Sequence, residues 1–301
     1  MDQEFLRKLT DIMGEGNVLP DELMSGHITF RVGGKASYFV EISDGKQLKP
    51  LIGLLKNEQM PYYIIGNGSN LLVKDEGYKG VIVKIGGKYS DIKIVGEKIY
   101  VNAGAMLSKT AKLACEAGLL GMEHLSGIPG TIGGAVAMNA GAYGSEIKDV
   151  IVSATVFDRE TEEIVKLGRD ELELGYRHSI IMEKEYIVLE AEFKLSFGNK
   201  EEIKAEMDRC TALRKEKQPL EYPSAGSTFK RPKGYFAGKL IEDAGLRGYA
   251  SGDACVSEKH CGFVVNKGNA TATDILNVID HVHRTVKEKF GVELEPEVRI
   301  L

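Results

Sequence analysis

The glycine-rich segment LSGIPGTIGGAVAMNAGAYG, residues 125–144, most constrains how this chain can fold. Glycine weakens the interior of helices and strands, so glycines at this spacing are costly in either element. Pro129 fixes one turn, and most of the other residues are small and apolar. We expect a long loop that a large flat ligand can approach, with a pyrophosphate held by backbone N–H groups. The alternative is tight packing of the loop on a sheet. The glycines are Gly127, Gly130, Gly133, Gly134, Gly141 and Gly144.

A second glycine loop follows a short apolar run in the sequence IIGNGSNLLV, residues 64–73. Successive N–H groups at Gly66, Asn67 and Gly68 can form a nest for phosphate, and the side chains of Ser69 and Asn70 add donors. A plain turn is the alternative, since Asn-Gly is a common turn pair. The spacing does not fit the G-x-G-x-x-G fingerprint or the P-loop, which disfavours a Rossmann fold and a phosphotransferase.

Hydrophobic periodicity predicts an α+β protein, with a β-rich part to about residue 196 and a smaller mixed part after it. Asp44 is expected to cap one helix and Thr273 another. The predicted helices cover residues 44–58, 107–117, 203–213, 236–245 and a segment from 273. The predicted strands cover 62–66, 80–85, 186–196, 261–266 and 295–301, with hairpins at 92–104 and 150–167.

Composition argues for a soluble enzyme of small anionic ligands. The 301 residues carry a net charge of −5, which gives a nucleic-acid partner no electrostatic support. Basic residues gather at 214–217 and 230–233, although each cluster is equally compatible with a solvated surface. The sequence shows no signal peptide and no apolar run long enough for a membrane span. We therefore expect a cytoplasmic protein with no membrane partner.

Cysteine and histidine spacing predicts no metal site. The four cysteines form no C-x-x-C pair, which disfavours zinc and disulfides and suits a reduced compartment. The histidines outside position 260 show no ligand pattern either. These residues are Cys115, Cys210, Cys255, Cys261, His27, His124, His178, His281 and His283.

Six motifs in the order of the chain resemble the UDP-N-acetylenolpyruvoylglucosamine reductase family. They are TFRVGG (29–34), GNGSNLLV (66–73), SGIPGTIGGAVAMNAGAYG (126–144), GYRHS (175–179), AGSTFKRP (225–232) and LEPEVR (294–299). The resemblance implies two FAD-binding sub-domains of the vanillyl-alcohol-oxidase type, at 1–80 and 81–200, followed by a substrate-binding domain at 201–301. It also implies the shorter form of the family, without the tyrosine-loop insertion.

The resemblance implies a reaction in two halves. NADPH reduces a non-covalently bound FAD, and the reduced flavin N5 passes hydride to UDP-N-acetylglucosamine enolpyruvate, giving UDP-N-acetylmuramic acid for peptidoglycan. By this resemblance Arg177 and Glu297 stabilise the enolate and Ser227 donates the proton. Without it, Arg177 would be expected in a surface ion pair, Glu297 at a solvated strand end and Ser227 in a loop cap.

The resemblance also implies a set of binding residues and a monomeric protein. Substrate contacts are expected from Tyr176, Lys217, Lys230, Arg231 and His260. FAD contacts are expected from Arg31, Gly66, Asn67, Gly68, Ser69, Asn70, Ser126, Gly127, Gly130, Thr131, Gly133, Gly134 and Ala135. Two alternatives stay open: another FAD-dependent oxidoreductase of the same fold acting on a different small substrate, and a non-catalytic nucleotide-binding module.

Overall fold

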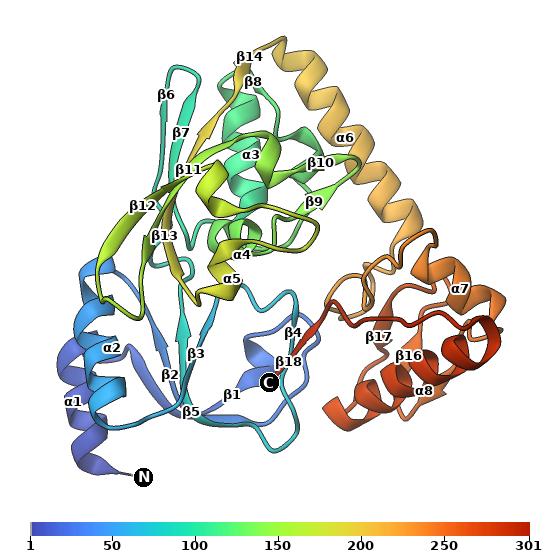
Figure 1. Cartoon of the computed structure of the whole chain (residues 1–301), viewed down its shortest axis with the longest axis horizontal. Coiled ribbons are helices and arrows are strands. Elements are labelled where there is room, and N and C mark those ends of the chain that lie inside the picture. The colour runs from blue at the N-terminus through green and yellow to red at the C-terminus, as the bar shows by residue number, and fades with distance from the viewer. Residues whose placement is uncertain (1) are drawn as a thin grey trace. The chain divides into compact units, whose positions relative to one another are not determined.

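The computed structural model describes residues 2–301, and the chain divides into two compact units built from interleaved segments. The larger unit comprises Met1–Pro20, Tyr38–Asn67 and Gly80–Leu213, and the smaller unit comprises Asp21–Ser37, Gly68–Lys79 and Arg214–Leu301. Figure 1 labels their elements. The three consecutive domains expected from the sequence stay a prediction.

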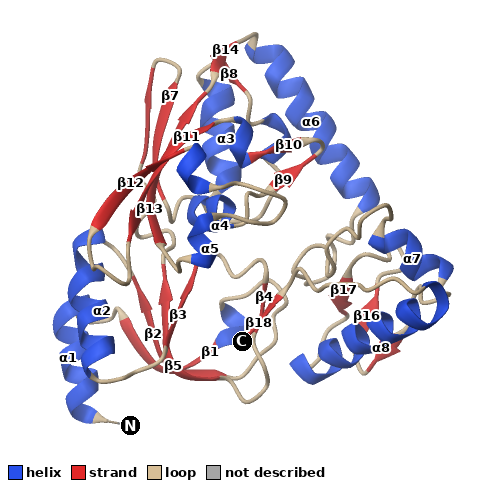
Figure 2. Cartoon of the chain, in the orientation of Figure 1, coloured by secondary structure: helices blue, strands red, loops and turns tan. Residues whose placement is uncertain are grey.

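A five-stranded antiparallel sheet forms the centre of the larger unit, in the order β12-β11-β13-β7-β6. Both hairpins predicted from alternating hydrophobicity are present in it, and β13 joins them, pairing Ala191 with Ala154 on one side and Val101 on the other. Helix α4 packs against β13 and β7 (Figure 2). The strands are β6 (Ile92–Val95), β7 (Lys98–Asn102), β11 (Ile151–Phe157), β12 (Ile164–Gly168) and β13 (Ile187–Lys194).

A second sheet has the order β1-β2-β5-β3 and contains one parallel pair, β3 with β5. The strands are β1 (Val18–Leu23), β2 (Lys35–Glu41), β3 (Tyr62–Ile65) and β5 (Tyr78–Lys84). Helices α1 (Gln3–Met13) and α2 (Leu48–Asn57) pack on each other. Asp44 caps the 3-10 turn that leads into α2, close to its predicted role. Helix α1 is not among the predicted elements.

The remaining elements of the larger unit are short, apart from two helices. They are α3 (Leu107–Glu116), α4 (Ile132–Ala137), α5 (Ile180–Glu183), β8 (Leu119–Leu120), β9 (Gly141–Ala142), β10 (Ser145–Glu146) and β14 (Ser196–Phe197). Helix α6 (Lys200–Lys217) begins in the larger unit and ends in the smaller one.

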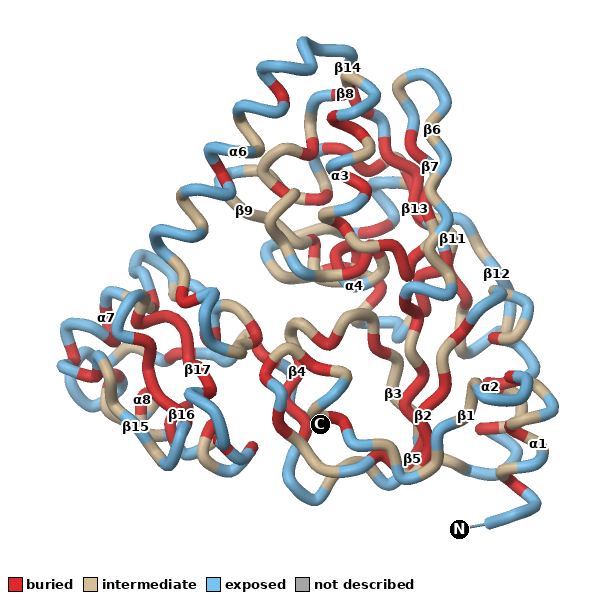
Figure 3. Tube along the Cα trace, turned by 180° about the vertical axis from the view of Figure 1, so that it is seen from behind, coloured by how far each residue is buried: buried red, intermediate tan, exposed pale blue. Residues whose placement is uncertain are grey.

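One continuous apolar core lies in the larger unit, where buried residues, red in Figure 3, follow the strands. Phe157 and Phe193 are 1% and 0% exposed within it. Burial of a side chain of this size contributes about 1.5–3 kcal/mol relative to leaving it exposed, so these strands hold the unit together.

The smaller unit places helix α8 (Ala272–Phe290) against a three-stranded antiparallel sheet, β15-β16-β17. The helix begins two residues earlier than predicted, because Thr271 rather than Thr273 is the N-cap, in a capping box with Asp274. Thr273 instead donates its N–H and hydroxyl to the carboxylate of Asp75. The other elements are α7 (Ala237–Asp243), β15 (Ala250–Ser251), β16 (Ala254–Val256) and β17 (Val264–Asn266).

A short parallel pair connects distant parts of the sequence within the smaller unit. Strand β4 (Leu71–Leu72) pairs with β18 (Arg299–Ile300), which shortens the strand predicted at 295–301 to two residues. The N–H of Lys74 then donates to the carbonyl of Leu301 over 2.8 Å. Across residues 2–301, none of the helices has both the length and the apolar character needed to cross a bilayer.

Candidate active site

The first glycine loop leaves β3 with its N–H groups open. Asn67 anchors the loop by donating its Nδ2 to the carbonyl of Pro129 over 2.6 Å. Within residues 2–301, the N–H groups of Asn67, Gly68 and Ser69 donate to no protein acceptor. Gly68 has φ +62°, which favours glycine. Three successive open N–H groups with a left-handed glycine between them can bind an anion.

The second glycine stretch uses its N–H groups internally around the start of α4. Gly133 donates to the carbonyl of Ala103 over 2.8 Å, Gly134 to Thr131 Oγ1 over 3.5 Å and Ala135 to the carbonyl of Thr131 over 2.8 Å. These three N–H groups are therefore not available to a pyrophosphate. At the start of α4, this stretch therefore fits the alternative expectation of tight packing.

The two glycine loops touch each other at Gly66. A Cβ atom added at Gly66 would lie 2.1 Å from Thr131 Oγ1, closer than real contacts allow. Thr131 is 3% exposed. Glycine at position 66 is therefore required for this contact, and the loops can approach a shared ligand together.

Arg177 lies at the tip of a two-residue hairpin turn. Gly175 and His178 bond to each other through both of their backbone N–H groups, at 3.1 and 3.3 Å. Arg177 has φ +52°, a conformation that costs a residue with a Cβ about 1–2 kcal/mol. Its guanidinium lies 5.2 Å from the ring centroid of Tyr176, which is 50% exposed. Strained backbone conformations cluster at functional sites, which supports Arg177 as a candidate.

Ser227 and Glu297 belong to neighbouring backbone segments of the smaller unit. Phe229 and Pro296 form an antiparallel bridge. Beside it, Glu297 N–H donates to the carbonyl of Thr228 over 2.8 Å, and Thr228 in turn donates its N–H to Gly262. Ser227 is exposed, whereas Thr228 is fully buried. The sequence positions 227 and 297 are thus brought together by their backbones.

Asn70 links the first glycine loop to the Glu297 segment. Its Nδ2 donates to the carbonyl of Glu297 over 3.1 Å, and its carbonyl accepts from Arg299 N–H over 3.0 Å. Arg31 is exposed, with φ +57°, and its segment contacts the first glycine loop, because Thr29 N–H donates to the carbonyl of Gly68 over 3.3 Å. The carbonyl of the preceding Phe30 accepts from the buried side chain of Asn266 over 3.1 Å.

The basic residues after Ser227 have partners in the protein. Lys230 forms an ion pair with Glu295, and Arg231 stacks 3.9 Å above the ring of Phe236. Lys217 is the last residue of α6 and is exposed. A diphosphate reaching Lys230 would therefore compete with the carboxylate of Glu295.

His260 is part of a local hydrogen bond and is largely removed from water. Burial lowers its pKa, and its Nδ1 accepts from Gly262 N–H over 3.1 Å. That hydrogen bond leaves the Nε2 nitrogen protonated in the neutral ring. A Cβ at Gly262 would lie 2.9 Å from His260 Cε1, so the glycine makes room for the ring.

His124, Glu206 and Cys210 place their ligand atoms within 4.8 Å of one another. The cluster could not be predicted from residue spacing, because η3 (Glu123–Leu125) and α6 meet only in the fold. However, the guanidinium of Arg209 binds both oxygens of Glu206, at 2.6 and 2.7 Å. Arg209 first, and then His124, lower the pKa of Glu206 to about 2. The cluster is therefore an ion-pair network, in which the guanidinium of Arg209 already binds the carboxylate oxygens of Glu206 that a metal ion would need.

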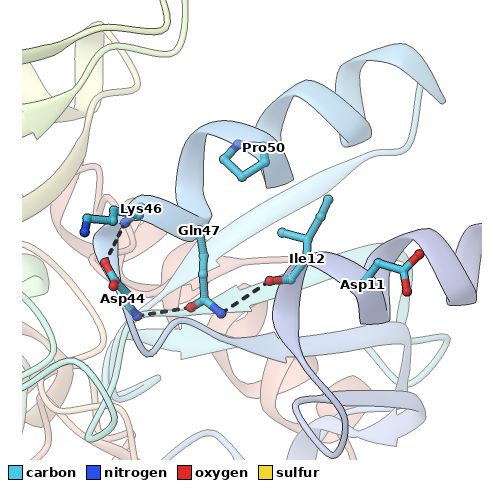
Figure 4. Close-up of a pocket in the computed structure, with 6 residues that line it drawn as sticks. All are labelled: Asp11, Ile12, Asp44, Lys46, Gln47 and Pro50. Carbon is cyan, nitrogen blue, oxygen red and sulfur yellow. Dashed lines mark hydrogen bonds between the residues drawn. The ribbon is translucent and has the colours of Figure 1, made fainter.

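A surface depression between α1 and α2 contains no predicted site residue (Figure 4). Gln47 crosses it, accepting from Asp44 N–H over 3.1 Å and donating to the carbonyl of Ile12 over 3.5 Å. These bonds cap the two helix ends. The lining residues are Asp11, Ile12, Asp44, Lys46, Gln47 and Pro50.

Comparison with family models matches residues 36–168 to an FAD binding domain. Residues 218–301 match the C-terminal domain of UDP-N-acetylenolpyruvoylglucosamine reductase. A protein of that name from Agathobacter rectalis is 53% identical, covering 100% of this chain and 99% of its own. Another from Caldanaerobacter subterraneus is 52% identical, covering 98% of this chain and 97% of its own.

Solved structures agree with these matches. The UDP-N-acetylenolpyruvylglucosamine reductase of Thermus caldophilus superposes with a TM-score of 0.80 at 36% identity, covering 93% of this chain and 97% of its own. A glucose oxidase superposes with a TM-score of 0.53 at 13% identity, covering 66% of this chain and 45% of its own. The second match shows likeness of fold alone. Together with the FAD binding domain, the C-terminal domain and the Thermus caldophilus structure, it confirms the predicted fold class.

Proposed function

The chain belongs to the UDP-N-acetylenolpyruvoylglucosamine reductase family, and we propose that Ser227, Arg177 and Glu297 carry out the second half of its reaction. It is an FAD-dependent oxidoreductase of peptidoglycan precursor synthesis, with NADPH as co-substrate. The observation that carries the proposal is the pairing of the Thr228 and Glu297 backbones, which holds Ser227 and Glu297 on adjacent segments.

The first glycine loop suits the pyrophosphate of FAD. The open N–H groups of Asn67, Gly68 and Ser69 provide donors without needing a lysine. When bound, FAD supplies the hydride chemistry of both half-reactions. We propose the other FAD contacts at Arg31, Gly66, Asn70, Ser126, Gly127, Gly130, Thr131, Gly133, Gly134 and Ala135.

Arg177 and Glu297 stabilise the charge that develops on the substrate. Reduction of the enol ether moves negative charge into the substrate carboxylate. The guanidinium of Arg177 can bind a carboxylate through two parallel hydrogen bonds and keeps its charge throughout. Glu297, when protonated, donates a further hydrogen bond to the same charge. Donors placed in advance stabilise a developing anion more than mobile water does.

Ser227 supplies the proton that completes the reduction. Its hydroxyl hydrogen goes to the carbon next to the one that receives hydride, forming the second new C–H bond, and the hydroxyl is restored by water. The cationic side chains of Lys230 and Arg231 follow it closely in sequence and favour the transient alkoxide.

Substrate binding is proposed to rest on charge and stacking. Lys217, Lys230 and Arg231 face the anionic diphosphate, Tyr176 contacts the sugar nucleotide, and His260 donates through its Nε2–H. We propose that the protein acts as a cytoplasmic monomer. Its binding partners are NADPH and UDP-N-acetylglucosamine enolpyruvate, whose classes follow from the family.

A rapid-mixing assay of the two half-reactions tests the proposal. The FAD-loaded protein should be reduced by NADPH, and the reduced protein should be reoxidised by UDP-N-acetylglucosamine enolpyruvate without oxygen. If NADPH reduces the protein but this substrate does not reoxidise it, the protein is another oxidoreductase of the same fold that acts on a different substrate. Failure of the protein to bind FAD would contradict both and favour a nucleotide-binding module.

A further inference from the structure

Two buried polar side chains hold the hairpin that carries Arg177. Asn139 and Ser179 are both 0% exposed, and neither was singled out in the sequence. Asn139 lies just past α4, in the second glycine stretch, and Ser179 closes the GYRHS motif. Fully buried polar groups are nearly always hydrogen-bonded, so the partners of these two side chains show what they hold in place.

Asn139 uses every polar group of its amide. Its Nδ2 donates to the carbonyl of Gly175 over 2.8 Å and to Glu146 Oε2 over 3.0 Å. Its Oδ1 accepts from Lys148 N–H over 2.9 Å. The amide therefore joins the base of the Arg177 hairpin to the β9–β10 hairpin. An aspartate could not donate these two bonds.

Ser179 fixes the other end of the same segment. Its hydroxyl donates to the carbonyl of Ala137 over 2.6 Å. Gly175 and Ser179 flank the turn, and their partners Asn139 and Ala137 are two residues apart at the end of α4. The hairpin is thus held at both ends by one short piece of backbone.

The backbone itself shows why such anchors are needed. Arg177 has φ +52° and Asn139 has φ +42°, both in the left-handed region. A turn with a positive φ at its third position normally contains glycine or asparagine there. An arginine in that conformation needs surrounding contacts to keep it there, and the only polar side chains bonded to the flanking Gly175 and Ser179 ends, among residues 2–301, are those described above.

We propose that Asn139 and Ser179 are positioning residues for Arg177, setting where its guanidinium meets the substrate carboxylate. The inference rests on the proposed role of Arg177. It adds two residues that act through the arginine and that make no contact with the substrate. A misplacement of about 1 Å can cost on the order of 100-fold in rate.

The test uses Asn139→Gly and Ser179→Ala in the FAD-loaded protein. Glycine suits φ +42°, so the first variant removes the amide without straining the backbone. Ser153→Ala is the control, because Ser153 is a buried serine of the same unit whose hydroxyl bonds elsewhere, to Glu192. We expect reoxidation of the reduced protein by substrate to slow about 10–100-fold in both variants, and reduction by NADPH to change less than about 2-fold.

A second readout does not depend on activity. Trypsin cleaves after arginine, and a turn held at both ends resists cleavage. We expect cleavage after Arg177, followed by mass spectrometry, to accelerate at least about threefold in both variants but not in Ser153→Ala. If Asn139→Gly does not fold, Ser179→Ala decides alone. Unchanged reoxidation and unchanged cleavage in folded Ser179→Ala would overturn the proposal.

Arg177→Lys separates this inference from the proposed function. If Arg177→Lys leaves reoxidation unchanged, the role of the arginine fails, whereas faster cleavage in the two variants would still support the anchoring of the turn. If Arg177→Lys slows reoxidation but the two variants do not, the positioning inference alone is wrong.

Discussion

The backbone N–H of Glu297 donates to the carbonyl of Thr228 over 2.8 Å, so Glu297 is hydrogen-bonded to the residue that directly follows Ser227. Ser227 precedes Thr228 directly, and its exposed hydroxyl is therefore placed by a residue that is itself fully buried. The position of the proton donor depends on the packing beneath it.

Thr228→Val should destabilise the smaller unit and misplace Ser227. Thr228 Oγ1 accepts from Val264 N–H over 3.0 Å, and valine would leave that buried N–H without a partner, at about 1–3 kcal/mol. Denaturant unfolding measures the loss. Thr110→Val is the control, because Thr110 is equally buried but only donates to a helical carbonyl, that of Met106. Equal losses in both variants would contradict the anchoring role.

Ser227→Ala should leave the first half-reaction intact and disable the second. The side chain is exposed, so stability should change little. Loss of a positioned proton donor typically costs on the order of 10²–10⁴-fold. Rapid mixing with NADPH and then with substrate measures each half separately. Equal slowing of both halves would show that Ser227 serves the structure.

Gly66→Ala should abolish retention of FAD. The new Cβ would lie 2.1 Å from Thr131 Oγ1 and would force the two glycine loops apart. Gly53→Ala is the matched control, because nothing lies within 4 Å of a Cβ there and alanine favours a helix. The flavin absorbance that remains after desalting distinguishes them. A fully yellow Gly66→Ala protein would mean that the loop contact does not matter for the cofactor.

Glu206 should contribute stability that disappears in acid. Its folded-state pKa is lowered to about 2, chiefly by Arg209 and then by His124, from an ordinary value of 4.5. A lowered pKa stabilises the fold above the ordinary value, and the contribution is lost as pH falls from about 4.5 toward about 2. The difference in unfolding free energy between the wild type and Glu206→Gln should shrink over that interval. Asp208→Asn, on the same helix, serves as control, and a difference that does not vary with pH would contradict the linkage.

The elements that the sequence predicted are those with strong local patterns. Alternating hydrophobicity identified both hairpins of the central sheet, and three- and four-residue spacing identified α6 and α8. Helix α3 was predicted from its alanine-rich sequence and from Gly118 as a stop. Helix α1 has the same kind of signal, with Asp2 as cap and Phe5, Leu9 and Met13 buried four residues apart, yet it is absent from the predictions. The Thr271 cap was missed because Thr273 also fits the N-cap preference.

Contacts between distant residues could not be predicted in this way. Nothing near Asn139 in the sequence indicates that its amide reaches Gly175, although asparagine in a glycine-rich stretch does suggest a left-handed residue. The hydrogen-bond partners of the Gly133 and Gly134 N–H groups could not be predicted from the sequence either. Their glycine pattern suggested open donors, but only the fold reveals that Ala103 and Thr131 accept from them. The Ser227, Arg177 and Glu297 assignments came from resemblance and stay predictions.

The parallel pairing of β4 with β18 has a consequence for biosynthesis. Residues 71–72 leave the ribosome long before residues 299–300, which complete their pairing. At a translation rate of about 5–20 residues per second, the segment beside the first glycine loop waits on the order of ten seconds or more for its partner. The segment beside the first glycine loop therefore completes its pairing only after residues 299–300 have been made, so we expect the proposed FAD contacts of that loop to form late.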